Sequence, residues 1–285
     1  MNAITLIMLV LKISLFLTAL GYGLKTPAAD AFYLFRNPGL LVRSVLAMNI
    51  IMPAIALVIV LNFDLPHLVK VALVAISVSP IAPLFPKKPL QAGGREGYVI
   101  GLMIIASILC LFLIPLTLKM LGGFYDKPVN TSIKGLVITA LVSVIVPLIL
   151  GVVLRYFASV LSGKIAHPVA RIAQILLLVS ALPILVKMFP AIIHLIGNGT
   201  VLAIAAFSVT GMLAGHFLGG PYQENRSVLA LASASRHPAI AFSVASANMP
   251  DHKLVPAAIL LYLLINAIVS IPYLKWLAKA NQTLK

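Results

Sequence analysis

Arg236 and His237 stand directly before Pro238 inside an otherwise apolar segment, and Ser233 and Ser235 precede them. A guanidinium buried in such a segment is costly unless it serves a site, and it presents a planar fork to a carboxylate, sulfonate or phosphate. His237 either caps the broken helix or relays protons. The two serines either line the cavity or hydrogen-bond back to their own helix. The pattern predicts an anion-binding site at this break, and the alternative role of Arg236 is that of a structural anchor of the break.

A second break lies earlier in the chain, where four prolines recur at every third residue around two lysines. The prolines are Pro80, Pro83, Pro86 and Pro89, and the lysines are Lys87 and Lys88. Each interior proline removes a backbone donor, at about 3 kcal/mol, and biases the preceding residue, from Ser79 to Lys88, away from helix. We therefore predict an interrupted helix. The two lysines either bind substrate or extend to the membrane surface.

The composition is that of a polytopic membrane protein. Of 285 residues, 61% are hydrophobic and 9% charged, and the mean hydropathy is +1.11. The net charge of +15 comes from 21 Lys and Arg scattered between apolar segments, which argues against nucleic-acid binding. Broken backbone at bilayer depth persists only where it is buried in protein or lines a cavity. The two breaks therefore predict a transport site.

Apolar windows of about 20 residues predict nine transmembrane helices in a single transporter domain, residues 1–285. The windows cover residues 4–24, 39–62, 67–91, 96–121, 131–156, 167–188, 191–216, 224–247 and 253–279. Turn residues separate them, among them Asp126-Lys127-Pro128 and Pro250-Asp251. No soluble domain fits between these spans.

The distribution of basic residues predicts the orientation. The side that holds the C-terminus collects Lys25, Arg36, Arg43, Arg95, Arg155, Lys164, Arg171, Arg226, Lys275, Lys279 and Lys285. The opposite side collects Lys70, Lys119, Lys127, Lys134, Lys187 and Lys253. This asymmetry places the C-terminus in the cytoplasm and the N-terminus outside, in a cell inner (plasma) membrane.

The two broken segments resemble each other in sequence. Val71 to Ala82 and Val228 to Ala241 are both rich in Ala, Val and Ser and both reach a proline. They are the third and eighth predicted spans, five apart and thus opposite in orientation, which indicates two inverted repeats of about 1–121 and 131–285. Coincidence between two helices of small residues is the alternative. Paired interrupted helices are typical of the binding site of a secondary transporter.

The chain resembles the bile acid:sodium symporter family. Leu11 to Asp30, followed by Arg36-Asn37-Pro38, is similar to the family's opening "MF.MGL.L...DF....RRP". Ser77-Val78-Ser79-Pro80 falls where the family has its Cys-Pro-Gly-Gly crossover, and Ala230 to Ala241 falls where it has "ALE.G.QN.GLA". The resemblance implies two unwound helices that cross near the membrane midplane in a core domain, which moves against a panel domain. It also implies inward transport of a bile acid or another organic anion with two sodium ions.

The departures from the family motif bear on whether this chain binds sodium. The resemblance places Ala232 and Arg236 where the family has a Glu and a Gln that bind sodium, His237 at its Asn, and Phe85-Pro86 at its Ser-Asn pair. Asn266 stands where the family commonly has Asn, with an interhelical hydrogen bond as the alternative role. All six acids fall at or between the predicted spans: Asp30, Asp64, Glu96, Asp126, Glu224 and Asp251. Either fixed cations replace sodium on the unwound carbonyls, or they bind the substrate.

We therefore expect a secondary carrier of a small organic anion, without a cofactor and with altered or absent sodium dependence. Its expected partners are the anion and the lipid bilayer, with a homo-oligomer left open. The alternatives are a conventional sodium-coupled symporter, an auxin-efflux-like carrier and an anion channel, which conducts without counterflow. No hydrolase, metalloprotease or phosphate-loop motif is present in the sequence, which argues against an enzyme.

Overall fold

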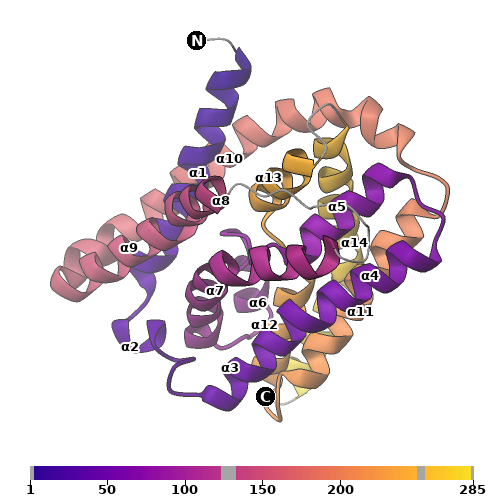
Figure 1. The fold of residues 1–285 in the computed structure, drawn as a ribbon. Coiled ribbons are helices and arrows are strands. Elements are labelled where there is room, and N and C mark those ends of the chain that lie inside the picture. Colours follow the sequence, from indigo (N-terminus) through magenta and orange to yellow (C-terminus); the bar gives the residue numbers. More distant parts are fainter. Residues whose placement is uncertain (1–2, 123–132, 249–253, 284–285) are drawn as a thin grey trace.

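The computed structural model describes residues 3–122, 133–248 and 254–283, and every regular element in these ranges is a helix (Figure 1). The predicted turns around Asp126 and Asp251 lie outside the described residues. The start of α1 and the end of α14 lie at opposite ends of the molecule in this view.

Eight helical segments in the described ranges are long and apolar enough to cross a membrane. They are α1 (Ala3–Lys25), α3–η1–α4 (Pro38–Val45, Leu46–Ile51, Met52–Asn62), α7 (Glu96–Gly122), α8–η2–α9 (Ile133–Ala140, Leu141–Ile145, Val146–Phe157), α10 (Ser159–His194), α11 (Thr200–Leu218), α12–α13 (Gln223–Ala234, Pro238–Asn248) and α14 (Val255–Thr283). The predicted class of all-helical, multi-pass membrane protein is confirmed. The count of nine spans stays a prediction, because the window 67–91 is not among the eight.

The window 67–91 is interrupted, as its prolines predict. Helix α5 (His67–Val78) ends before Ser79, whose φ of −73° and ψ of 149° are extended, and a short helix α6 (Lys87–Gln91) follows the break. The prolines do not keep Lys88 out of a helix, since Lys88 and Pro89 both lie in α6. Pro89 is tolerated there because the first turn of a helix has no internal acceptor for the missing N–H.

The second predicted break lies between α12 and α13. Ser235, Arg236 and His237 are not helical, and Pro238 is the first residue of α13. A proline is favourable at that position because its fixed φ suits a helix start and its missing N–H has no partner to lose.

Two span boundaries differ from the sequence prediction. The windows 167–188 and 191–216 meet inside α10, which runs for 36 residues and begins at Ser159. The turn comes later, at Gly197, Asn198 and Gly199, whose φ values of 141°, 44° and 76° are all positive. Glycine adopts such angles without a steric penalty, and asparagine tolerates them better than most residues. These three residues therefore end one span and begin the next.

The helices form two packed groups. In the first, α1 packs against α9 and α10, and we call these helices, with α8 and η2, the three-helix group. Gly23 and Gly151 allow α1 and α9 to touch, because a Cβ on Gly23 would lie 2.3 Å from the Leu148 carbonyl oxygen and 2.9 Å from the Gly151 Cα. The remaining helices, with α2 and α6, form the crossing group around both breaks.

Candidate functional site

The two broken helices meet at their breaks. The backbone N–H of His237 donates to the carbonyl oxygen of Pro80 at 2.8 Å, joining segments that lie 157 residues apart. Ser79, Pro80 and His237 are all buried. A backbone hydrogen bond therefore joins the two breaks that the sequence predicts.

The prolines create unpaired carbonyl groups at this crossing. In an α-helix the carbonyl of residue i accepts from the N–H of residue i+4. The partner of Ser79 would be Pro83 and the partner of Ala234 would be Pro238, and neither proline has an N–H to donate. Both carbonyls lie at the C-terminal end of a half-helix, which carries partial negative charge. Each break therefore exposes an acceptor that needs a donor from elsewhere.

A π-helix supplies a third such carbonyl. Within η1 the Met52 N–H donates to the Ala47 carbonyl, five residues earlier. The Met48 carbonyl therefore loses its usual partner Met52, and the next candidate in the wider register is Pro53, which has no N–H. Proline in the interior of this span accounts for both the π-helix and the unpaired Met48 oxygen.

Arg236 donates to two of these carbonyl groups. Its Nη1 lies 3.0 Å from the Ser79 oxygen and its Nη2 lies 3.0 Å from the Met48 oxygen. The side chain is 2% exposed, and its Nε has no hydrogen-bond partner among the described residues. Hydrogen bonds from a charged donor contribute about 1.5–3 kcal/mol each. Arg236 thus joins the end of α5 to η1 and leaves its charge without a neutralising acid.

The remaining unpaired carbonyl, that of Ala234, receives its donor from α14. The hydroxyl of Tyr262 donates to the Ala234 carbonyl oxygen. Tyr262, Asn266 and Ser270 are spaced by four residues, so they lie on one face of α14. Asn266 is buried, and its Oδ1 has no partner among the described residues. At the far end of this face, Lys88 Nζ donates to Ser270 Oγ at 2.9 Å.

His237 links the crossing to the three-helix group. Its imidazole Nε2 lies 3.0 Å from Ser143 Oγ, and Ser143 belongs to η2. The ring is fully buried, and Nδ1 has no hydrogen-bond partner in the described part of the chain. Like η1, η2 precedes a proline, Pro147, and the same loss of a backbone donor accounts for its wide turn.

The predicted site residues divide into two sets. Ser79, Pro80, Arg236, His237 and Pro238 lie at the crossing, with Pro83 next to it in the first break. The others lie further along the broken segments or on α14: Lys87, Lys88, Pro86, Pro89, Ser233, Ser235 and Asn266. Lys87 is exposed and Lys88 is half-buried. Lys88 of the second set reaches the Asn266 face of α14 through its hydrogen bond to Ser270.

The serines at the breaks differ in what their hydroxyl groups contact. Ser79 Oγ donates to the Ile76 carbonyl at 2.8 Å, which is the helix back-bonding alternative. Ser233 is fully buried, and its Oγ lacks a partner among the described residues, while Ser235 is half-buried.

Sequence reasoning missed four residues at the site: Met48, Ser143, Tyr262 and Ser270. Signals for them exist in the sequence. Pro53 and Pro147 each follow the π-helix that positions Met48 or Ser143, and Tyr262 and Ser270 flank Asn266 at helical spacing.

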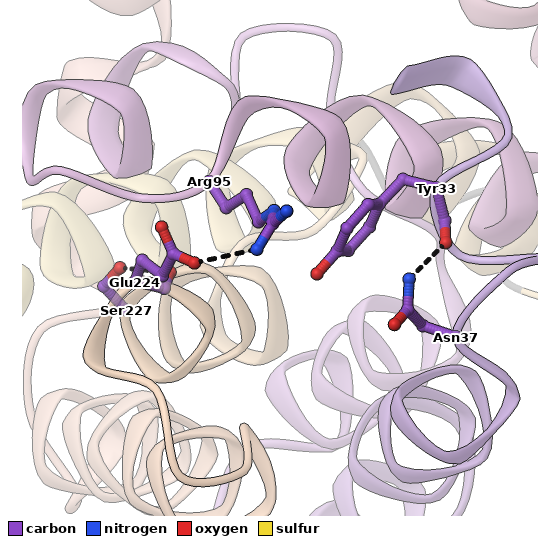
Figure 2. Close-up of polar contacts among 5 residues, drawn as sticks. All are labelled: Tyr33, Asn37, Arg95, Glu224 and Ser227. Atoms are coloured by element: carbon purple, nitrogen blue, oxygen red, sulfur yellow. Dashed lines mark hydrogen bonds and ion pairs between the residues drawn. The ribbon is translucent and has the colours of Figure 1, made fainter. Parts of the chain in front are cut away.

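A separate polar cluster ties the crossing group together at the end of the molecule where α12 begins (Figure 2). Arg95 donates to the Glu224 carboxylate at 3.1 Å, and its guanidinium lies 4.7 Å from the centre of the Tyr33 ring. Asn37 Nδ2 donates to the Tyr33 carbonyl at 2.8 Å. Tyr33 belongs to the connection from α1 to α3, so Arg95 links that connection to the first turn of α12.

The crossing carries net positive charge. No Asp or Glu is buried among the residues whose exposure the structure describes, whereas Arg236 is. Unpaired charge in a low-dielectric setting attracts an opposite charge strongly. The arrangement is suited to holding an anion and unsuited to holding a second cation.

A model of the Sodium Bile acid symporter family matches residues 12–195. The match includes the first break and η1 and ends before the second break. A search of curated proteins found no match.

Proposed function

The chain belongs to the sodium bile acid symporter family, whose members are membrane transporters, and on that premise we propose that it carries a small organic anion without sodium. The observation that carries this proposal is the guanidinium of Arg236 held between the Ser79 and Met48 carbonyl groups.

The charge of the crossing supports an anionic substrate. Arg236 is tethered by neutral carbonyls, so its positive charge is not cancelled within the described buried residues. An arriving carboxylate or sulfonate supplies the missing counter-charge. A cationic substrate would meet repulsion instead, and Lys88 near the same face of α14 adds to it.

The absence of sodium coupling is supported by where Arg236 lies. Sodium is held in carriers by unwound carbonyls and the C-terminal ends of half-helices, and one such group, the Ser79 carbonyl at the end of α5, binds Arg236 here. The resemblance further places Ala232 and Arg236 at the family's Glu and Gln, so this chain lacks the carboxylate that would offset a bound cation. A fixed charge keeps the site ready for an anion but removes the mobile ion that couples transport to a gradient.

The finer architecture belongs to the same proposal. The interrupted segment α5–α6 adds one crossing of the bilayer to the eight long helical segments, which makes nine. It is the third crossing in chain order and α12–α13 is the eighth, and the two are related by the inverted repeat. Nine crossings place the C-terminus in the cytoplasm and the N-terminus outside, in the cell inner membrane, given the excess of Lys and Arg on the C-terminal side. The crossing group moves against the three-helix group during transport.

Two measurements on purified protein test the proposal. The first is a thermal-shift screen against organic anions, with sodium or choline as the cation, since a ligand of the folded state stabilises it by mass action. The second is uptake of a stabilising anion into proteoliposomes in the same two salts. We expect stabilisation and uptake that change little between sodium and choline.

Two outcomes would contradict it. A saturable requirement for sodium would mean that the carbonyls and serines of the breaks hold an ion beside Arg236. Anion flux without saturation and without counterflow would indicate a channel. When Arg236 is replaced to test its role, the matched control is Arg95→Ala, which removes an equally charged but exposed guanidinium.

A further inference from the structure

The hydrogen bonds around Ser143 fix the chemical form of His237. Ser143 Oγ lies 2.5 Å from the Thr139 carbonyl oxygen and 3.0 Å from His237 Nε2. Two oxygen atoms approach so closely only when a hydrogen lies between them, and a carbonyl has none to give. The single hydroxyl hydrogen of Ser143 therefore points to Thr139, and His237 Nε2–H must donate to Ser143.

This assignment leaves Nδ1 of the neutral ring as a bare acceptor. A neutral imidazole carries one N–H, and it is already used at Nε2. Nδ1 is buried and has no donor among the described residues. A buried acceptor without a donor destabilises the folded state, so its presence at the crossing calls for a ligand.

Burial disfavours a charged His237 ring while the site is empty, and the buried cation next to it in the chain gives a proton no compensation. Its neighbour Arg236 is a buried cation. The ionisable groups whose side chains the structure describes, on α12 and on the elements that pack against α12 and α13, are His67, Lys70, Lys87, Lys88, Glu96, Tyr98, Cys110, Lys134, His216, Glu224, Arg226, Tyr262, Tyr273, Lys275 and Lys279. Glu96 is exposed and Glu224 pairs with Arg95, so neither acid neutralises the crossing.

A bound anion lowers the electrostatic cost of adding a proton to His237. Without an anion, a proton on His237 would raise the local charge from +1 to +2 beside Arg236. With a monovalent anion at Arg236, the same proton would raise it only from zero to +1. The penalty for the proton therefore falls when the anion binds, and linkage requires that the proton tightens anion binding equally.

Resting on the proposed function, we propose that Nδ1 of His237 takes up one proton when the anion binds, so that the carrier moves an organic anion together with a proton. The proton comes from the water on the side where the anion enters, and it returns to water where the anion leaves. Ser143 acts as a positioning residue, because its acceptance of Nε2–H directs the proton to Nδ1.

The first test examines the ring in the free protein, through nitrogen NMR of histidine-labelled protein in nanodiscs, with His237→Asn identifying the signal. We expect the neutral Nε2–H tautomer, and Ser143→Ala should shift the population towards Nδ1–H. A doubly protonated ring, or an Nδ1–H tautomer in the unaltered protein, would overturn the proposal.

The second test measures anion affinity between about pH 6 and about pH 8, where carboxylates and sulfonates both stay ionised. The probes are acetate, lactate, benzoate and taurocholate. Uptake of one proton per anion should strengthen binding by up to about tenfold for each unit of falling pH. His237→Asn should bind the same anion with little pH dependence.

The control is His216→Asn. His216 is half-buried, and its Nδ1 lies 2.9 Å from the Tyr273 hydroxyl, away from the crossing contacts. This variant should keep the full pH dependence. Anion binding that does not respond to pH in the unaltered protein would overturn proton uptake and leave the proposed function standing. Failure of every probe to bind would count against the proposed function, and proton coupling would fall with it.

Discussion

Arg236 Nη2 lies 3.0 Å from the carbonyl oxygen of Met48, a residue 188 positions earlier whose carbonyl has no donor within its own helix. The same guanidinium bonds the Ser79 carbonyl, which Pro83 leaves unpaired. Prolines in two different spans thus prepare acceptors, and one arginine from a third segment satisfies both. This is the physical relationship on which the first two predictions rest.

Arg236→Ala should abolish most anion uptake and lower the melting temperature. It removes the fixed charge and leaves two buried carbonyls without donors, at about 1–3 kcal/mol each. Arg236→Lys should recover part of the stability and little of the uptake, because an ammonium lacks the planar fork. Uptake into proteoliposomes and thermal unfolding measure the two effects. Arg95→Ala is the control, and normal uptake by correctly inserted Arg236→Ala protein would contradict the prediction.

The double variant Ala232→Glu with Arg236→Gln should acquire a response to sodium. These changes restore the residues that the resemblance assigns to the family's sodium site. Ala232 is fully buried, so the new carboxylate is costly until a cation binds beside it. We expect low stability in choline and a rise in melting temperature with added sodium. Ala230→Glu with Arg236→Gln buries an acid two residues away and should not respond. Equal responses from the two variants would refute the assignment.

Gly23→Ala should destabilise the three-helix group strongly. Its new methyl would lie 2.3 Å from the Leu148 carbonyl oxygen, which is backbone and has little freedom to move. Overpacking of this kind costs about 1–3 kcal/mol or more. Gly163→Ala is the matched control, since Gly163 lies in α10 with nothing within 4 Å of its would-be Cβ. That variant should be neutral or slightly stabilising, by about 0.5–1 kcal/mol. Similar melting temperatures for both variants would contradict the close contact of α1 and α9.

Arg95→Glu should change stability only modestly. The Arg95 and Glu224 side chains are 48% and 42% exposed, and solvent screens such pairs to about 0–1 kcal/mol. Stacking of the guanidinium on Tyr33 adds about 0.5–1 kcal/mol at an exposed site. The reversed pair, Arg95→Glu with Glu224→Arg, should recover the ion pair but not the stacking. Chemical or thermal unfolding measures the difference, and full recovery by the reversed pair would show that Tyr33 contributes nothing.

A reporter fused after Lys285 should be active in the cytoplasm. The excess of Lys and Arg on the C-terminal side of the predicted spans motivates this expectation. Paired fusions of a cytoplasmic and an external reporter measure it directly. Activity confined to the external reporter would rule out the arrangement of nine spans.

The sequence predicted the breaks because proline acts locally. Pro80 and Pro238 remove donors from their own helices wherever those helices lie, so both interruptions are visible without a fold. The charged residue at the second break was visible for the same reason, since an arginine in an apolar segment is costly wherever it packs.

The partners of these residues were not predictable in the same way. Met48 and Ser143 meet Arg236 and His237 only because three separate segments pack together, and a single sequence holds no record of that proximity. The π-helices depend on how Pro53 and Pro147 are accommodated, which the surrounding packing decides. The start of α10 was predicted at residue 167 instead of Ser159 because Phe157-Ala158-Ser159 contains neither glycine nor proline to mark the turn.

The turn at Gly197, Asn198 and Gly199 has a mechanical consequence. It joins α10 of the three-helix group to α11 of the crossing group through backbone angles that glycine changes at little energetic cost. The connection from α1 to α3 is anchored instead, because Tyr33 is stacked under Arg95. Of these two connections, the turn at residues 197–199 is the more compliant. A rotation of the two groups would take up torsion there more readily than near Tyr33, leaving the helices on either side intact.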